Sequence, residues 1–163
     1  WQLEIKERDN NTEGSAGLTE NRRGRFRLHA TYKIMPAVEL RSRVEWTSFQ
    51  IGSLGRSRGF LAYQEAVVRP LSSPVYGSLR YAIFDTQDFD TRVYTFENDL
   101  FAAISIPGFA GRGARYFINL TWRVNEWLRL ESRLEQTMQR LAVTDSGQTG
   151  RVTGWKMQAS VRF

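Results

Sequence analysis

Apolar and polar residues alternate along most of this chain, and the alternation is clearest at positions 155–163. Every second residue from Trp155 to Phe163 is apolar, and the residues between them include Lys156 and Arg162. Successive side chains of a β-strand point to opposite faces of the sheet. The pattern therefore predicts a strand with one apolar face and one charged face.

The same two-residue period recurs at 1–6, 26–34, 38–46, 75–83, 116–122 and 128–138. The stretch 127–141 is also rich in good helix formers. Between 128 and 138, however, its charges fall on odd positions and its leucines on even ones, which favours a strand. No apolar run approaches the ~20 residues of a membrane helix. We therefore expect one all-β antiparallel domain over residues 1–163.

Polar, glycine-rich stretches separate the expected strands. Longer loops are expected at 9–24, 51–58 and 142–152, and short turns at Pro36, at 70–74 and at Asn125-Glu126. Strands of a barrel alternate in direction, with short turns on one side. All the short turns fall on one side of the membrane only if 92–106 forms two strands. Two strands there give a barrel of about ten strands, whereas one long strand gives nine. The prediction is an antiparallel transmembrane β-barrel of about ten strands, or the C-terminal part of a larger barrel.

The polar faces of these strands carry full charges, which is typical of outer-membrane barrels with an apolar outside and a polar lumen. The expected lumen-lining charges are Arg41, Arg43, Glu45, Arg80, Glu97, Arg115, Arg123, Arg129, Glu131, Arg133, Glu135, Lys156 and Arg162. The expected lipid-facing residues are Leu120, Trp122, Leu128, Leu130, Trp155, Met157, Val161 and Phe163. In a narrow barrel such charges pair across strands and fill the lumen, and in a wider one they line a path for ions. For a small barrel we favour the filled lumen, in which any excess arginine requires water or an anion.

Composition narrows the function classes further. The 23 Lys and Arg against 17 Asp and Glu give a net charge of +6, but these charges are spread through the strands. That spread argues against a nucleic-acid partner. Cysteine is absent, which excludes disulfides and thiolate metal sites. Aromatic residues make up 13%, which suits the girdles of a barrel and also any packed β core. The start at Trp1 indicates a processed mature chain, a recombinant product or part of a longer polypeptide.

Several segments resemble one family. They are Gly-Phe-Leu-Ala-Tyr-Gln-Glu at 59–65, Arg-Tyr-Ala-Ile-Phe-Asp-Thr at 80–86, Arg-Val-Tyr-Thr-Phe-Glu-Asn-Asp at 92–99, Ile-Pro-Gly-Phe-Ala-Gly-Arg-Gly at 106–113 and Leu-Glu-Gln-Thr at 134–137. They resemble the C-terminal barrel region of large envelope proteins from Bacteroidota-like bacteria, often described as helix-hairpin-helix-domain proteins. The likeness covers about 43–163.

The resemblance implies a bacterial outer-membrane location and no particular reaction. In that family an N-terminal region precedes the barrel, so this chain would be the end of a longer polypeptide or one chain of a split assembly. The terminal Phe163 resembles the assembly signal of outer-membrane barrels. The implied partners are the lipid bilayer and lipopolysaccharide, the barrel assembly machinery and other envelope subunits.

Candidate chemistry in the sequence is sparse, and we expect no cofactor and no metal. His29 is the single histidine, and a structural role is favoured over a base in a lipid-modifying barrel enzyme. Asp85, Asp88 and Asp90 lack the ligand spacing of a calcium loop. The glycines at 108, 111 and 113 are better explained by turn geometry than by phosphate binding. The expected role is a structural anchor, scaffold or narrow pore, and not an enzyme. A small lipid-modifying barrel enzyme and a soluble β-barrel binding module are the alternatives.

Overall fold

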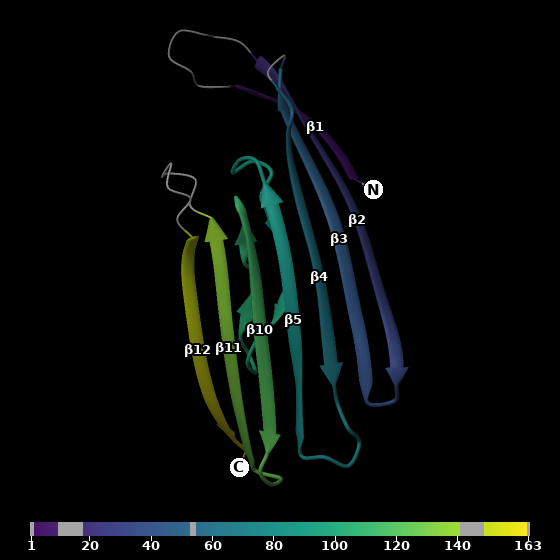
Figure 1. Ribbon diagram of the computed structural model, residues 1–163, viewed down its shortest axis with the longest axis vertical. Helices are drawn as coiled ribbons and strands as arrows, with labels where there is room; N and C mark the ends of the chain where they lie inside the picture. The colour runs from purple at the N-terminus through teal and green to yellow at the C-terminus, as the bar shows by residue number, and fades with distance from the viewer. Residues whose placement is uncertain (1, 10–17, 53–54, 141–148, 163) are drawn as a thin grey trace.

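The computed structural model describes residues 2–9, 18–52, 55–140 and 149–162, and within these ranges every regular element is a β-strand. Eight long strands form one sheet (Figure 1). They are β1 (Gln2–Asp9), β2 (Leu18–Met35), β3 (Val38–Ile51), β4 (Ser57–Val68), β5 (Val75–Thr86), β10 (Arg112–Arg123), β11 (Leu128–Arg140) and β12 (Thr149–Val161).

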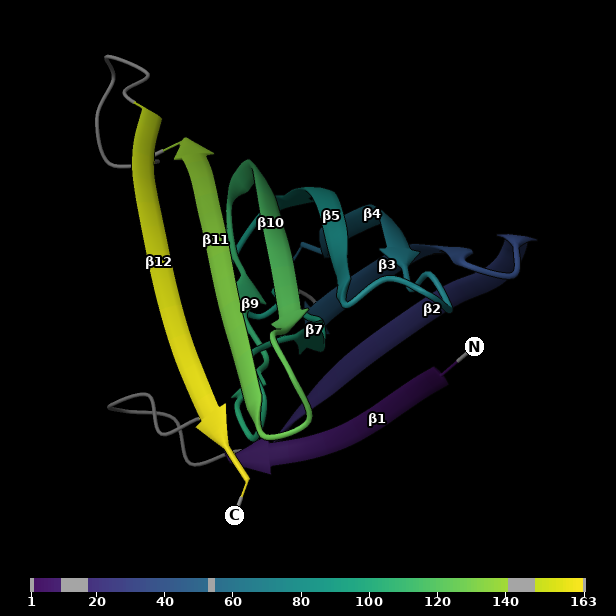
Figure 2. The ribbon, with the colours of Figure 1, turned by 90° about the horizontal axis from the view of Figure 1, so that it is seen from below.

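The sheet is an antiparallel meander with the order β1-β2-β3-β4-β5-β10-β11-β12. Each strand pairs with the long strand that follows it, and one register irregularity lies between Lys33 and Met35 in the β2–β3 ladder. The sheet is curved, as Figure 2 shows from below. Its edge strands β1 and β12 do not pair with each other, so the sheet is open. The antiparallel all-β prediction is confirmed, and the closed barrel stays a prediction.

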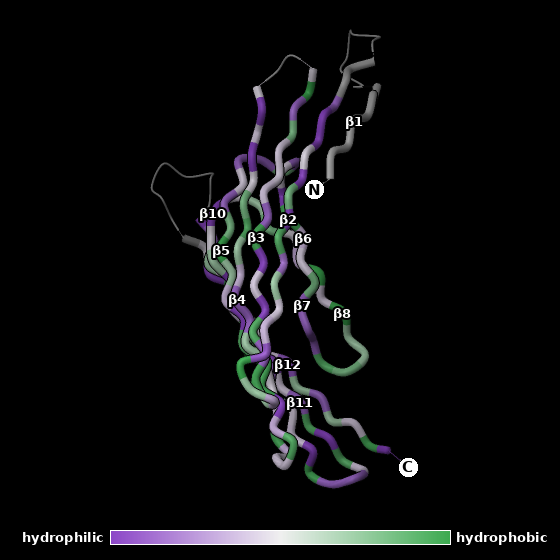
Figure 3. Tube along the Cα trace, turned by 90° about the vertical axis from the view of Figure 1, so that its right-hand side faces the viewer, coloured by the Kyte–Doolittle hydropathy of each residue, from purple (hydrophilic) through white to green (hydrophobic). Residues whose placement is uncertain are grey.

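The stretch 92–106 differs from the expected pair of spanning strands. After β5 the chain leaves the sheet, and it rejoins the sheet at β10. Between them, β6 (Val93–Tyr94) pairs with β9 (Gly108–Phe109), and β7 (Glu97–Asn98) pairs with β8 (Ile104–Ser105). We call residues 87–111 the covering segment, because they lie against one face of the large sheet, on the side where β7 and β8 stand out in Figure 3. Among the described residues the sheet therefore has eight strands and not the ten predicted.

The directions of the strands still follow the turn argument. The short connections 36–37, 69–74 and 124–127 all lie at the end of the sheet where β12 also ends (Figure 1). The covering segment leaves and re-enters at the opposite end, so it adds no crossing of the sheet. A segment that crosses the sheet twice and one that does not cross it at all both leave β10–β12 running in the same directions. The positions of the turns therefore could not distinguish these two paths for residues 92–106.

A small apolar core holds the covering segment against β4 and β5. Its members are Leu61, Tyr63, Ala82, Phe84, Val93 and Phe109. The rings of Phe84 and Phe109 have centroids 4.9 Å apart, within the range of favourable aromatic pairs. At Gly59, a Cβ atom would lie 2.4 Å from the Thr91 carbonyl oxygen, so β4 needs a glycine where the covering segment passes closest. We call the face that carries this core the inner face.

Candidate functional site

The two faces of the sheet have opposite chemistry. On the inner face, charged side chains such as Glu45, Glu65 and Arg133 are almost fully buried. On the other face, which we call the outer face, large apolar side chains such as Leu28 and Tyr81 are exposed. A sheet in water normally buries its apolar face and exposes its charged one. This sheet has the reverse arrangement.

The apolar outer face forms a band of constant height. Positions 75–83 in β5, 114–122 in β10 and 153–161 in β12 each carry no charged residue on that face. Charged residues follow at one end of the band, where Arg112 and Asp85 pair at 2.5 Å and Arg151 is exposed. Nine residues per strand match the ~9–11 that a membrane-spanning β-strand requires. The band therefore has the height of a bilayer core.

The residues expected to face lipid lie on this outer face where the structure describes them. Leu120, Trp122, Trp155, Met157 and Val161 are exposed, and the side chain of Trp155 is 68% accessible. The other described members of the set, Leu128 and Leu130, are half-buried by their neighbours on the same face. Phe163, with its expected role as assembly signal, lies outside the described residues.

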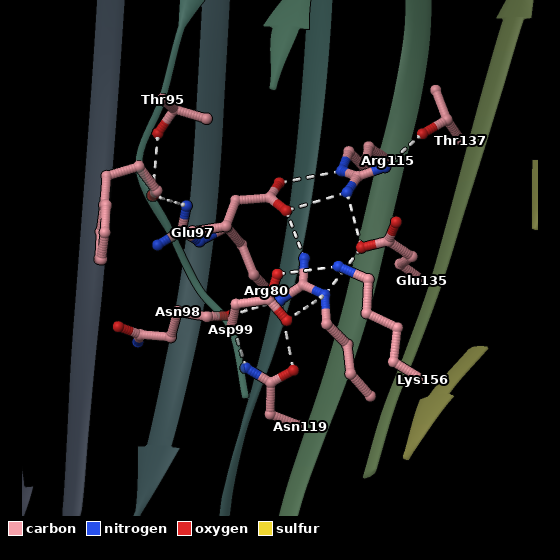
Figure 4. A network of polar contacts seen from close by, with 12 residues as sticks. Arg80, Thr95, Glu97, Asn98, Asp99, Arg115, Asn119, Glu135, Thr137 and Lys156 are labelled. Atoms are coloured by element: carbon pink, nitrogen blue, oxygen red, sulfur yellow. Dashed lines mark hydrogen bonds and ion pairs between the residues drawn. The ribbon is translucent and has the colours of Figure 1, made fainter. Parts of the chain in front are cut away.

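On the inner face of β10–β12 lies a cluster of ion pairs, shown in Figure 4. Glu97 of the covering segment accepts hydrogen bonds from Arg115 at 2.9 and 3.0 Å and pairs with the fully buried Arg133. Arg133 also pairs with Glu135 at 2.7 Å and donates to the backbone carbonyl of Asn98. We call this group the balanced cluster. It has four cations and four carboxylates: Arg115, Arg129, Arg133, Lys156, Glu97, Asp99, Glu131 and Glu135.

Asp99 is a buried carboxylate of the covering segment, and its pKa is shifted. Burial raises the pKa of Asp99, but the hydrogen bond from the Lys156 ammonium at 2.9 Å, the Leu100 amide and the charge of Arg133 outweigh it. The net result is a pKa below the ordinary aspartate value. The carboxylate is thus held in its charged form, which is the form that the surrounding cations need.

A second cluster lies on the inner face of β2–β5. Glu45 pairs with Arg25 at 3.3 Å, with Arg27 at 2.7 Å and with Arg43. Glu65 pairs with Arg80 at 2.8 Å and lies 3.9 Å from Arg41. Arg41 also pairs with Glu39, at 2.6 Å. We call this group the cationic cluster, since its ion pairs join five arginines to three glutamates: Arg25, Arg27, Arg41, Arg43, Arg80, Glu39, Glu45 and Glu65.

A cavity of about 440 Å³ opens within the cationic cluster, between β2–β5 and the covering segment. Its wall includes Arg41, Arg43 and Arg80, and the covering segment contributes Phe96 and Asn98. His29 also lines the cavity, opposite Arg43 in the strand register. Within the described part of the chain, His29 makes no hydrogen bond to a carboxylate or hydroxyl group. The geometry of a base and its nucleophile is therefore not present there.

Two expected lumen charges lie apart from both clusters. The Arg123 guanidinium stacks 5.2 Å from the centre of the Tyr76 ring near the turn end of β10. Arg162 is exposed, and its backbone amide donates to the Trp127 carbonyl at 2.9 Å. The structure brings the remaining expected lumen charges into the balanced or the cationic cluster.

Sequence reasoning missed Glu65 as a site residue. The stretch 59–69 contains Phe60-Leu61 and Val67-Val68, which break the alternation of apolar and polar residues. In the structure its odd residues face inward, and Glu65 lies opposite Arg80 in the β4–β5 ladder. A search for one charge among small and apolar residues on the odd positions would have found it.

The acidic residues at the end of β5 and directly after it have ordinary structural roles. Asp85 pairs with Arg112, and the Asp88 carboxylate accepts hydrogen bonds from the Thr91 amide and hydroxyl at 2.9 Å. Burial raises the pKa of Asp88, but hydrogen bonds from Ser57 and Thr91 bring it below the usual aspartate value. Among the described residues, no group of three His, Asp or Glu is placed to hold a metal ion. The same residues contain no helix that is long and apolar enough to cross a membrane.

Comparison with protein-family models, with curated proteins and with solved structures gave no match for this chain. The resemblance to the C-terminal barrel region of the Bacteroidota envelope proteins therefore stays a prediction.

Proposed function

We propose that this chain forms part of the wall of a transmembrane β-barrel in a bacterial outer membrane, with the covering segment inside the lumen. In this arrangement the outer face contacts lipid and lipopolysaccharide, and the barrel assembly machinery inserts the sheet. The observation that carries the proposal is the covering segment's position on the charged face, which leaves the apolar face exposed.

The exposed outer face argues against a soluble binding module. Soluble monomers rarely expose contiguous apolar patches larger than a few hundred Å². Here exposed apolar side chains occur on β2, β3, β5, β10, β11 and β12, and include Trp46, Leu79 and Ile118. In water, the covering segment would gain more by burying these side chains than by burying charged groups, whose desolvation costs several kcal/mol per ion. In hydrocarbon, the observed arrangement is the favourable one.

The covering segment also bears on the size of the barrel. An eight-stranded barrel has an interior that side chains alone can fill. This inner face carries a 25-residue segment at positions 87–111, and the side chains of Tyr94 and Ile104 in that segment are exposed. In a bilayer the free edges of β1 and β12 also need backbone partners. We therefore propose a barrel of more than eight strands, of which this sheet is one part.

The hydrogen bonds of the covering segment favour an anchor or scaffold over an open pore. It is bonded to strands across the sheet, through Arg43 to the Thr95 hydroxyl, Arg80 to the Phe96 carbonyl and Asn119 to the Asn98 carbonyl. Near its turn, Gln158 donates to the Phe101 carbonyl at 3.1 Å. A segment held by arginine, asparagine and glutamine side chains from several strands fills the space through which ions would pass.

Fluorescence quenching by lipids tests the proposal directly. The purified chain is folded into vesicles whose acyl chains carry bromine at a shallow or a deep position. Single-tryptophan variants then report separately on Trp122 and Trp155. Quenching of Trp122 and Trp155, together with slower gel migration after heating, is the expected result. Folding in plain buffer with no quenching by brominated lipid would refute the membrane location.

A further inference from the structure

The two clusters of the inner face differ in charge, and only one of them has space for a ligand. The balanced cluster has equal numbers of cations and carboxylates (Figure 4). Its arginines also donate hydrogen bonds to the Thr137 hydroxyl and the Asn119 side-chain oxygen, and Asn119 donates to the Asn98 carbonyl. The cationic cluster has two more arginines than glutamates among its ion-paired members. Arg43 and Arg80 are buried, and buried charges require a counter-charge or water, whereas the other three arginines are 28–44% exposed. The cavity of about 440 Å³ lies beside these arginines.

We propose that this cavity binds an oxyanion, either a phosphate or a carboxylate group of a small molecule. Four arginines and two glutamates line it, and Glu45, which is not part of the wall, pairs with two of these arginines, so the four arginines exceed their carboxylate partners by one positive charge. The planar guanidinium group matches the two oxygens of a phosphate or carboxylate with paired hydrogen bonds. A volume of this size is within the range of small-molecule sites.

Arg41 is the arginine best placed to bind the ligand. Its Nε donates to Glu39 at 2.6 Å, and its Nη1 lies 3.9 Å from Glu65, so its guanidinium is the least committed of the four. By contrast, Arg43 is bonded to Glu45, Thr95 and the Tyr94 carbonyl. The Arg41 side chain is 28% exposed, and so it can turn toward a ligand without disturbing the fold.

The rest of the cavity wall indicates what else the ligand carries. Tyr63 and Phe96 supply aromatic surface, and Phe96 is exposed. Thr31, His29 and Asn98 supply further polar groups. The site therefore suits a small molecule that has an anionic group at one end and an apolar or planar body next to it.

The test measures binding of inorganic phosphate and of acetate to the folded full chain at low ionic strength, by the rise in unfolding midpoint and by ³¹P line broadening for phosphate. Sodium chloride at equal ionic strength is the reference. Arg41→Gln should weaken phosphate binding about tenfold, the loss expected for one charged hydrogen bond. Arg129→Gln is the matched control, since Arg129 is exposed to nearly the same extent as Arg41, at 27%, and pairs with Glu131, but belongs to the balanced cluster. The affinity of the Arg129→Gln variant for phosphate should equal that of the unmodified chain.

A third variant keeps the test decisive if Arg41→Gln does not fold. Glu39→Gln removes one carboxylate from the cavity wall and should tighten phosphate binding. Stabilisation by phosphate alone assigns the site to phosphate groups, and stabilisation by acetate as well assigns it to oxyanions in general. No binding beyond the chloride reference, or equal weakening by Arg41→Gln and Arg129→Gln, overturns the proposal. The assay works in detergent or in plain buffer, so a soluble chain that binds phosphate would refute only the membrane location.

Discussion

Arg133 and Glu97 form an ion pair in which the two side chains are 0% and 1% exposed, between β11 and the covering segment. Arg133 lies on a strand of the large sheet, and Glu97 lies on the segment that covers the inner face. The Arg133 guanidinium also stacks 4.2 Å from the centre of the Phe117 ring. The pair therefore joins the two layers of the molecule at a point where water has no access.

Arg133→Gln should lower the free energy of unfolding by about 3 kcal/mol, because it leaves the buried Glu97 and the half-buried Glu135 with Arg115 as the one arginine that they still share. Urea unfolding followed by tryptophan fluorescence gives the value. Arg112→Gln is the control, since Arg112 pairs with Asp85 on the exposed outer face and should leave stability nearly unchanged. If the two variants lose equal stability, the balanced cluster does not hold the covering segment.

Gly59→Ala should detach the covering segment from β4. The new Cβ atom would lie 2.4 Å from the Thr91 carbonyl oxygen and 2.5 Å from the Thr47 hydroxyl, and both groups belong to one hydrogen bond. Hydrogen exchange of the amides in 87–111 should become faster, while exchange in β10 and β11 stays slow. At Gly55, a Cβ atom would meet nothing within 4 Å, so Gly55→Ala is the matched control. Unchanged exchange in Gly59→Ala would contradict the close approach seen here.

Acid should weaken the attachment of the covering segment through Asp99. The pKa of Asp99 is lower in the folded protein than its ordinary value, so its contribution to stability is present above about pH 4. That contribution is lost as the pH falls through the folded-state pKa. Unfolding measured between pH 2 and 6 should show a shallower acid slope in Asp99→Asn than in the unmodified chain. Asp90→Asn, an exposed change in the same segment, should keep the original slope.

The sequence was sufficient to predict the two chemical faces but not the path of the covering segment. The alternation from Trp155 to Val161 and from Leu128 to Met138 is a local property of each strand, and the structure has both strands. The odd residues Val93, Thr95 and Glu97 also alternate inward and are buried, so 92–106 resembles a spanning strand in sequence. The covering segment differs from a strand of the large sheet in its pairing partners, because β6 pairs with β9 and β7 with β8. Those partners are set only when the chain folds.

The candidate site was predictable to the same extent. The charges of β3 and β11 could be assigned to one face by parity alone. Which charge meets which depends on register and on the covering segment, as in the pairing of Glu65 with Arg80 and of Lys156 with Asp99. The difference in charge between the balanced and cationic clusters follows from those pairings. This charge difference could therefore not be predicted from the sequence.

Leu120→Arg distinguishes lipid from water outside the sheet. Leu120 is 50% exposed on the outer face of β10, within the apolar band at 114–122 and three residues before the strand ends at Arg123. In a bilayer, an arginine near the midplane of a barrel's lipid face costs about 2–4 kcal/mol, and near the interface about 0–1 kcal/mol. In water, the same replacement of an exposed leucine would change stability little.

The matched control is Ala114→Arg, on the same face of the same strand but two residues from the charged end at Arg112. Both variants are folded into vesicles and unfolded with guanidinium. We expect Leu120→Arg to lose more stability than Ala114→Arg, because the penalty depends on depth in hydrocarbon and not on the loss of a leucine contact alone. Leu120→Ala separates the two causes, since it removes the contact without adding a charge. If Leu120→Arg is no less stable than Leu120→Ala, hydrocarbon does not surround the outer face.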